Sequence, residues 1–127
     1  MKAFNHTNAK TLAEARTALA GGKAEIIAGG TDLIGRLKDN VLPDTMYPAS
    51  VINIKTIAPA LDYIKEEAGV LKVGATTKLA DIASNQAISQ KYTALAQAAL
   101  RVATPHVRDM GTIGGNLAQL HRCWYFR

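Results

Sequence analysis

Two glycine-rich segments, about eighty positions apart, constrain this chain of 127 residues more than any other feature. The first covers residues 28–33 (AGGTDL) and follows an apolar run; the second covers residues 111–117 (GTIGGNL). Glycine has no Cβ, so backbone N–H groups in such segments can close around phosphate oxygens, most readily where a helix begins. Each segment also places a threonine, Thr31 or Thr112, beside its glycines. One such segment alone is most often a turn. The pair together predicts a ligand with two phosphates, bound from both sides.

The first half of the chain alternates strand and helix signals. Thr11 and Glu14 form a capping box, in which a hydroxyl and a carboxylate accept hydrogen bonds from amides at a helix start. The first glycine segment comes directly after a predicted strand, and Thr31 or Asp32 can cap the helix that follows it. A strand, a glycine loop and a helix in this order are typical of a phosphate site. We predict strands at 4–6, 25–28 and 51–54, and helices at 12–20 and 33–38.

The second half begins with two short apolar runs joined by a turn, which predict a β-hairpin. Thr76 or Thr77 can cap the helix that follows. Farther on, apolar residues repeat at the spacing of a core-facing helix, and Thr104-Pro105 is read as its end. The predicted elements are hairpin strands at 61–66 and 70–75, helices at 78–84 and 89–103, and a loop at 106–110. This pattern predicts an α+β arrangement with one subdomain to about residue 55, a second from residue 56, and the two glycine segments in the crevice between them.

Composition excludes several classes of function. The net charge of +5 is spread along the chain without a basic run, so we expect no nucleic-acid site and only a mild bias toward anionic ligands. No apolar run approaches the roughly 20 residues of a membrane helix, and no signal-peptide stretch is present, so we expect a cytoplasmic protein. Cys123 is the single cysteine, which rules out an intrachain disulfide. The histidines His6, His106 and His121 lack metal-ligand spacing.

The glycine segments do not fit the common nucleotide-binding motifs. Gly30 and Gly35 have the spacing of a phosphate-binding loop of the Walker type, but Arg36 and Leu37 follow instead of lysine and a hydroxyl residue. The dinucleotide fingerprint GxGxxG occurs at neither segment, which argues against an NAD-dependent dehydrogenase. No set of carboxylates, serine and histidine suggests hydrolysis. The residues therefore favour binding of a phosphate-bearing cofactor over acid–base catalysis by the chain itself.

Three segments together carry a resemblance to a known family. Residues 28–33, residues 73–77 (VGATT) and residues 103–117 (ATPHVRDMGTIGGNL) resemble, in order and spacing, the FAD-binding (medium) subunit of molybdenum hydroxylases of the xanthine dehydrogenase and carbon monoxide dehydrogenase type. The TIGGN motif with its upstream TPxxR is specific, and the resemblance covers essentially the whole chain. It implies an α+β, two-lobed FAD-binding domain of the molybdopterin-dehydrogenase (PCMH-like) type. Residues 1–55 are expected to form the N-terminal lobe, and residues 56–127 the start of a second lobe that is incomplete here.

The resemblance also implies a function and a set of binding residues. The family's subunit relays electrons from iron–sulfur clusters through FAD to an acceptor, beside a molybdopterin-binding large subunit and a [2Fe–2S] small subunit. The cofactor carries the redox chemistry, and the protein binds and tunes it. The rival interpretation is a non-catalytic nucleotide-binding or interaction module that no longer holds flavin. Carried over residue by residue, the expected FAD-binding residues are Ala28, Gly29, Gly30, Thr31, Asp32, Leu33, Thr76, Thr77, Gly111, Thr112, Ile113, Gly114, Gly115 and Asn116.

The chain departs from the family pattern at its C-terminal end. Members of the family are longer, so this chain is expected to be an N-terminal fragment. Cys123 opens the run Cys-Trp-Tyr-Phe-Arg, which resembles the branch similar to the beta subunit of 4-hydroxybenzoyl-CoA reductase. In that branch the matching cysteine is the first ligand of an additional [4Fe–4S] cluster. Such a cluster normally takes four thiolates, so the resemblance implies a cluster only in a longer parent protein.

Overall fold

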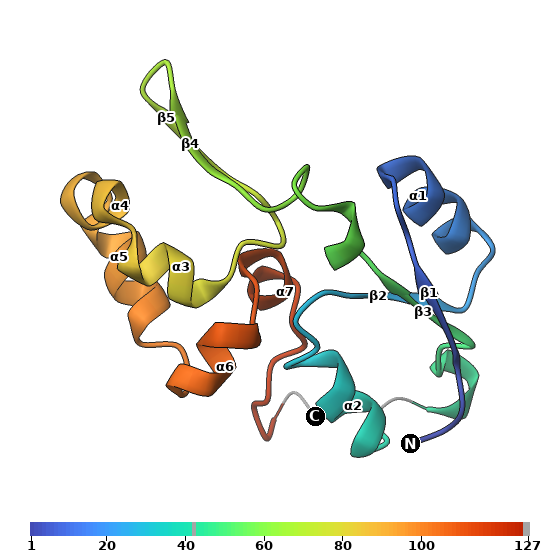
Figure 1. Cartoon of the computed structure of the whole chain (residues 1–127). Coiled ribbons are helices and arrows are strands. Elements are labelled where there is room, and N and C mark those ends of the chain that lie inside the picture. Colours follow the sequence, from blue (N-terminus) through green and yellow to red (C-terminus); the bar gives the residue numbers. More distant parts are fainter. Residues whose placement is uncertain (42, 126–127) are drawn as a thin grey trace.

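The computed structural model describes residues 1–41 and 43–125 and mixes helices with two small sheets (Figure 1). Three parallel strands, β1 (Asn5–Asn8), β2 (Ala24–Ile27) and β3 (Ser50–Asn53), form the first sheet in the order β1-β3-β2. Residue Ile52 of β3 stands in register with Thr7 on one side and Ile26 on the other. β3 comes last in the chain but lies in the middle of the sheet, so β1 and β2 form its two edges. The β2 edge lines the cavity that is described below.

Helix α1 (Leu12–Ala20) begins where the capping box predicts. The Glu14 amide donates to the Thr11 hydroxyl at 3.1 Å, and the Glu14 carboxylate accepts from the Lys10 amide at 2.6 Å. Gly22 follows the helix with φ of +75°, a left-handed conformation that glycine adopts without strain. The predicted helix at 12–20 is therefore confirmed, together with its start at the capping box.

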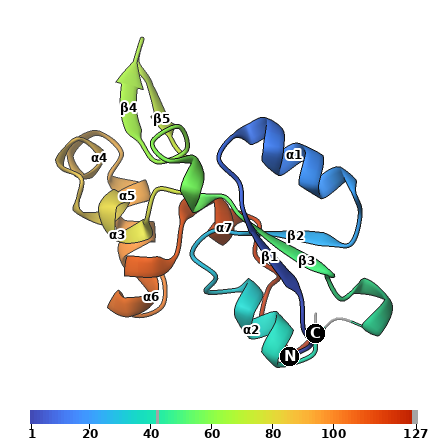
Figure 2. The same ribbon diagram turned by 45° about the vertical axis from the view of Figure 1, so that its right-hand side comes forward.

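The central strand β3 is buried on both faces. Adjacent residues of a strand point to opposite sides, and Val51 and Ile52 are 0% and 1% exposed. Ile52 packs with Ala15 of α1, whereas Val51 packs with Leu37 of α2 (Leu33–Lys38). The two helices therefore cover opposite faces of the sheet, as Figures 1 and 2 also show.

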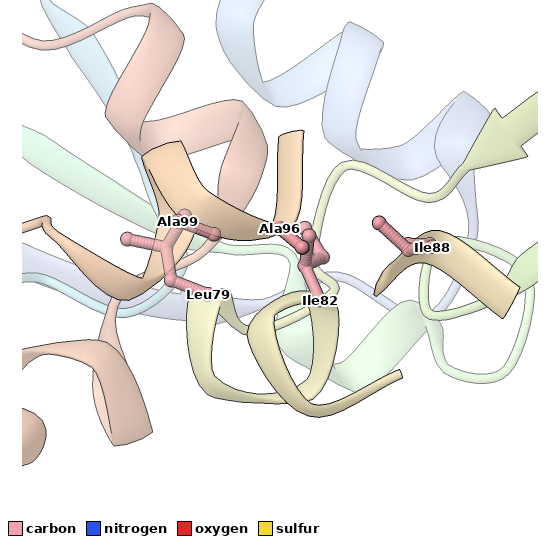
Figure 3. Packing of buried hydrophobic residues seen from close by; sticks show 5 residues of the cluster. All are labelled: Leu79, Ile82, Ile88, Ala96 and Ala99. Carbon is pink, nitrogen blue, oxygen red and sulfur yellow. The ribbon is translucent and has the colours of Figure 1, made fainter. Parts of the chain in front are cut away.

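The rest of the chain builds around a second core. Leu79 and Ile82 of α3 (Leu79–Ser84) pack against Ala96 and Ala99 of α5 (Thr93–Leu100), whose small side chains let the two helices approach closely (Figure 3). Ile88 completes this core. The antiparallel hairpin β4 (Ile64–Glu67) and β5 (Val70–Val73) projects from it. The remaining helices are α4 (Gln86–Lys91), α6 (Pro105–Met110) and α7 (Ile113–Leu117), and two 3-10 turns are formed by Asp44–Met46 and Lys55–Ile57.

Two predictions in this region are wrong. The single helix expected at 89–103 is interrupted at Tyr92, whose φ of −128° and ψ of 48° end α4 and precede α5. The loop expected at 106–110 is helix α6. Thr104 is its N-cap and accepts from the Val107 amide at 3.4 Å, and Pro105 takes the first helical position, which suits proline. The Thr-Pro pair therefore starts a helix, and the preceding helix α5 has already ended at Leu100.

The capping residues also differ from expectation at two helices. Asp32 is the N-cap of α2 but makes no side-chain cap hydrogen bond, and Lys78, not Thr76 or Thr77, is the N-cap of α3. Within residues 1–41 and 43–125, no helix combines the length and apolarity needed to cross a membrane.

Candidate functional site

The two glycine segments lie against each other in space. A Cβ atom added to Gly29 would collide with the backbone carbonyl oxygen of Met110, the residue before the second segment. A Cβ atom on Gly111 would lie 3.4 Å from the Thr31 hydroxyl oxygen. The close approach of two backbones explains why glycine occupies position 29, since any side chain there would separate the segments. The meeting of the two segments, predicted from the sequence, is confirmed.

A cavity of about 440 Å³ lies between the free edge of β2 and helix α7. Its size is in the range of ordinary ligand pockets. Figure 1 shows α7 beside the chain that leads from β2 into α2. The residues of the two glycine segments that line the cavity are Ala28, Gly29, Gly30, Thr31, Asp32, Leu33, Thr112, Gly114 and Gly115.

The first glycine segment presents unused backbone donors to this cavity. In the described part of the chain, no acceptor takes the amide hydrogens of five of its six residues. Gly30 has φ of +74°, so the backbone reverses its direction there without the strain that a side chain would bring. Successive amides in such a turn form a concave nest that suits an anion. The five residues are Ala28, Gly29, Gly30, Thr31 and Leu33.

The second segment uses most of its amides within the protein. Ile113 donates to the Thr77 carbonyl and Gly114 to the Ala75 carbonyl, both at 2.9 Å. Gly115 donates to the Thr112 hydroxyl at 3.3 Å, which makes Thr112 the cap of α7. The expectation that both segments expose amides therefore holds mainly for the first, since in the described part of the chain the Thr112 amide is the one donor of residues 111–116 without an acceptor. The second segment forms a rigid wall of the cavity.

Packing against neighbouring backbone requires glycine at position 114 of the second segment. A Cβ atom on Gly114 would lie 2.7 Å from the Ala75 carbonyl oxygen, closer than real Cβ atoms approach. A Cβ atom on Gly115 would lie 3.1 Å from the Thr112 hydroxyl oxygen of the same turn. At Gly114 the nearest obstacle to a side chain is therefore the Ala75 backbone.

A charged cluster borders the first segment. The Arg36 side chain is 13% exposed and lines the cavity, with its Nε 3.1 Å from Oδ2 of Asp32 and an Nη 3.8 Å from Glu25. The Nε is out of line for a hydrogen bond to Asp32, so the attraction is mainly Coulombic. Sequence reasoning missed Arg36 as a cavity residue. Its position four residues after Asp32, on the same face of α2, is the signal that could have found it.

Thr76 and Thr77 lie away from this cavity. The buried Thr77 hydroxyl accepts from the Tyr63 amide and donates to the Tyr63 carbonyl, each at 3.1 Å, and so fixes the base of the hairpin. Thr76 lines a separate small cavity near Lys55 and Lys78. Their expected role in binding therefore has no direct support from position.

Three more predicted residues also lie outside the cavity lining. Ile113 packs against the helical core, and the Asn116 side-chain oxygen accepts from Gln119, which does line the cavity. Gly111 contacts the first segment but not the cavity.

Cys123 is exposed as a free thiol. Among residues 1–41 and 43–125, no group of three or more histidine, cysteine, aspartate or glutamate side chains is arranged to hold a metal ion. Phe126 and Arg127, which complete the run after Cys123, lie outside the described residues.

The arrangement fits the diphosphate part of a dinucleotide cofactor. Unpartnered amides supply donors, glycines allow close approach of backbone, and the apolar side chains of Leu19, Ile27 and Ile54 line the rest of the cavity. The two carboxylates of the lining, Asp32 and Glu25, are paired with Arg36. The chemistry available to these residues is binding and orientation.

Comparisons with known proteins agree with this geometry. Residues 2–123 match the family described as the FAD binding domain in molybdopterin dehydrogenase. The chain is 38% identical over 121 residues to the nicotinate dehydrogenase FAD-subunit of Eubacterium barkeri, covering 93% of this chain and 39% of that protein. It is 34% identical over 120 residues to the carbon monoxide dehydrogenase medium chain of Hydrogenophaga pseudoflava, covering 93% of this chain and 40% of that protein.

Solved structures show the same fold. The quinoline 2-oxidoreductase of Pseudomonas putida 86 superposes with a TM-score of 0.85 at 30% identity, covering 94% of this chain and 41% of the other. Carbon monoxide dehydrogenase from Hydrogenophaga pseudoflava gives 0.84 at 32% identity, covering 91% and 39%. The chain thus spans about two fifths of the length of the relatives that it matches. It belongs to the family of FAD-binding domains of molybdopterin dehydrogenases, with FAD as the family's cofactor.

Proposed function

We propose that this chain is the N-terminal part of the FAD-binding subunit of a molybdenum-dependent oxidoreductase and that it holds the diphosphate of FAD in the cavity between its glycine segments. The single observation that carries this proposal is the nest of unpartnered amides at Ala28, Gly29, Gly30, Thr31 and Leu33, which line that cavity. An oxygen-rich dianion is the chemical group that satisfies several converging N–H donors at once.

The two glycine segments have different roles in this proposal. The first segment donates hydrogen bonds to the phosphate oxygens through its free amides. The second closes the opposite side of the cavity with Thr112, Gly114 and Gly115, whose positions are fixed by their own hydrogen bonds. Arg36 adds a positive charge to the lining, although Asp32 and Glu25 hold its guanidinium. The remaining residues predicted for FAD binding, Thr76, Thr77, Gly111, Ile113 and Asn116, act in this proposal by supporting these walls.

When bound, FAD supplies the redox chemistry that relays electrons between iron–sulfur clusters and an acceptor. The residues of the chain bind and orient the cofactor and keep water from its phosphates. A molybdopterin-binding large subunit and a [2Fe–2S] small subunit are the proposed partners. The names of the relatives as FAD-subunit and medium chain support an assembly of several subunits.

The proposal includes two lobes, residues 1–55 and 56–127, with FAD between them. Separate hydrophobic cores support a division into two lobes, although Ile57 of the second range packs in the first core. For a longer parent protein we also propose that Cys123 is one ligand of a [4Fe–4S] cluster. Its exposure supports this role, and three further thiolates would have to come from outside this sequence, which has one cysteine.

Titration of the apoprotein with FAD, followed by quenching of flavin fluorescence, tests the proposed function. Gly30→Val places a branched side chain in the nest, where φ is +74° and an added Cβ atom would lie 3.3 Å from Ile27 and Ile34. Gly22→Val is the matched control, because Gly22 has φ of +75° with open space around it. We expect Gly30→Val to weaken FAD binding by about tenfold or more, as for the loss of two or three hydrogen bonds, and Gly22→Val to leave it unchanged.

A folded wild-type chain that binds neither FAD nor ADP would refute this proposal and favour the interaction module without flavin. Equal FAD affinity in Gly30→Val and wild type would show that FAD binds elsewhere on the chain.

A further inference from the structure

A second cavity, of about 270 Å³, lies next to the proposed FAD cavity, and Thr112 lines both. We name it the lysine cavity. Its polar lining consists of Lys55, Asp62, Thr76, Lys78 and Thr112. Ile57, two residues after the first of these lysines, packs in the first core, and Leu79, next to the second lysine, packs in the second core. The lysine cavity therefore lies where the two lobes meet.

The Thr76 hydroxyl is an unpartnered polar group in this cavity. Thr76 is 7% exposed, and its hydroxyl has no hydrogen-bond partner in the described part of the chain. The two other buried threonines, Thr77 and Thr112, use their hydroxyls to bind backbone groups. A buried hydroxyl without a partner costs stability unless water or a ligand reaches it. The Thr76 hydroxyl oxygen is not sealed from solvent, so it opens into the cavity and can bind a ligand there.

Two positive charges of the cavity lack a counter-ion. Neither Lys55 nor Lys78 forms an ion pair within residues 1–41 and 43–125. The backbone beside each of them is held by a hydrogen bond. The Lys55 amide donates to the Asn53 side chain at 3.1 Å, and the Leu79 amide donates to the Gly111 carbonyl at 2.9 Å. Two ammonium groups on fixed backbone, one from each lobe, suit an anionic ligand.

The Asp62 carboxylate selects among anions. It lines the same cavity and forms no ion pair with either lysine. A fully ionised anion would meet only repulsion from this carboxylate, whereas an anion that carries a proton can donate a hydrogen bond to it. A phosphate monoester carries such a proton near pH 6, because its second pKa is about 6. Sulfate is fully ionised in this range.

We propose that the lysine cavity binds a small phosphate monoester, separate from the diphosphate of FAD. Lys55 and Lys78 neutralise its charge, the Thr76 hydroxyl donates to one phosphate oxygen, and Asp62 accepts from the protonated one. One water molecule takes up about 30 Å³, so a cavity of about 270 Å³ leaves room for a few carbon atoms beside the phosphate group. The inference does not depend on the proposed function, since it uses none of the amides of the nest.

NMR titration of the full chain with glycerol 3-phosphate, at about pH 6, tests this site through the backbone amide shifts. We expect saturable shifts at residues 55, 62 and 76–78. Thr76→Val removes the hydroxyl and should weaken binding by about three- to tenfold, the effect of one lost hydrogen bond. Thr76→Ser keeps the hydroxyl and should bind within about twofold of wild type. The amide spectrum of each variant also shows whether it is folded.

Paired lysine variants test the charges. Lys55→Gln combined with Lys78→Gln should weaken binding by about tenfold or more, since two charged donors are lost. Lys10→Gln combined with Lys38→Gln is the matched control. It removes the same charge from two exposed residues that do not line the cavity, and should change the affinity by less than about twofold.

Two further ligands test the chemistry. Glycerol lacks the phosphate and should cause no saturable shift. Sulfate should bind more weakly than glycerol 3-phosphate, because it has no proton to donate to Asp62. Asp62→Asn should narrow this difference, since an amide can donate to an oxygen of sulfate.

Five results would overturn the inference. They are shifts confined to residues 28–33, equal weakening in the two lysine pairs, wild-type affinity in Thr76→Val, saturable shifts with glycerol alone, and sulfate binding as tight as that of the ester. A wild-type chain that takes up glycerol 3-phosphate at residues 76–78 but does not bind FAD would refute the proposed function and leave this inference standing.

Discussion

Replacing Gly29 with alanine tests the contact between the two glycine segments directly. The added Cβ atom would collide with the carbonyl oxygen of Met110 and lie 2.8 Å from its carbonyl carbon. Because both obstacles are backbone atoms, no rotation of a side chain can relieve the clash. The end of α6 must move away from the first segment, or the first segment must move from β2.

The cost follows from the size of this overlap. Overpacking by one carbon in a tight site usually costs about 1–3 kcal/mol, and a backbone obstacle places Gly29→Ala near the upper end, at about 3 kcal/mol. For a chain of this size each kcal/mol lowers the melting temperature by about 4 °C. We therefore expect Gly29→Ala to melt about 12 °C below wild type in thermal unfolding followed by circular dichroism.

Gly21→Ala is the matched control, because Gly21 has a right-handed backbone and its added Cβ atom would lie 3.5 Å from the nearest atom, an ordinary contact. We expect its melting temperature to stay within about 2 °C of wild type, the effect of a tolerated surface substitution. A Gly29→Ala protein that melts within the same margin would refute the reasoning, because the segments would then not be in contact.

Three further predictions concern the walls and the cores. Gly114→Ala should lower the free energy of unfolding by about 1–3 kcal/mol, since its Cβ atom would press on the Ala75 carbonyl. Gly115→Ala should cost less than about 1 kcal/mol, because a small shift of the Thr112 side chain relieves the contact. Equal losses in urea denaturation would contradict this. Thr77→Val should cost about 1–3 kcal/mol, because the Tyr63 amide loses its acceptor while the Tyr63 carbonyl keeps only the bond from the Gly74 amide. An unchanged urea midpoint would exclude that role. Ile52→Ala should lower the free energy of unfolding by about 2–5 kcal/mol in the same assay. The more exposed Ile26 is the control, and a smaller loss for Ile52→Ala than for Ile26→Ala would show that β3 is not the centre of the first core.

Local signals predicted much of the fold because they act over a few residues. The capping box fixes α1, and the apolar run before the first glycine segment gives β2. The interruption at Tyr92 could not be read from periodicity, since α4 and α5 both pack apolar residues on the same core and the stripe continues across the break. Thr104-Pro105 signals the end of one helix and the start of another equally well, and only the packing of α6 against α3 decides between the two.

The sequence could not predict which backbone amides are hydrogen-bonded within the protein, for a different reason. Both segments are rich in glycine and both carry a threonine, so their donors look alike in the sequence. Whether a donor is free depends on acceptors far from it in the chain: Ala75 and Thr77 bring carbonyls to the second segment, whereas no acceptor in the described residues reaches the amides of Ala28 to Thr31. Tertiary contacts, not composition, separate the binding loop from its supporting wall.

This difference between the segments has a consequence for how the site can respond to a ligand. The second segment is held by hydrogen bonds that exist without a ligand, so its shape does not depend on binding. The first segment is held by the close contact of Gly29 and by bonds from the Leu120 amide and the Arg122 guanidinium, while the amides of Ala28 to Thr31 depend on a ligand to be satisfied. A diphosphate that pairs those amides would therefore stabilise the first segment selectively. Amide hydrogen exchange should consequently slow at residues 28–33 when ADP is added, and stay nearly constant at residues 113–116. Equal protection of both segments would mean that the ligand tightens the whole contact between them and that the wall is not preformed.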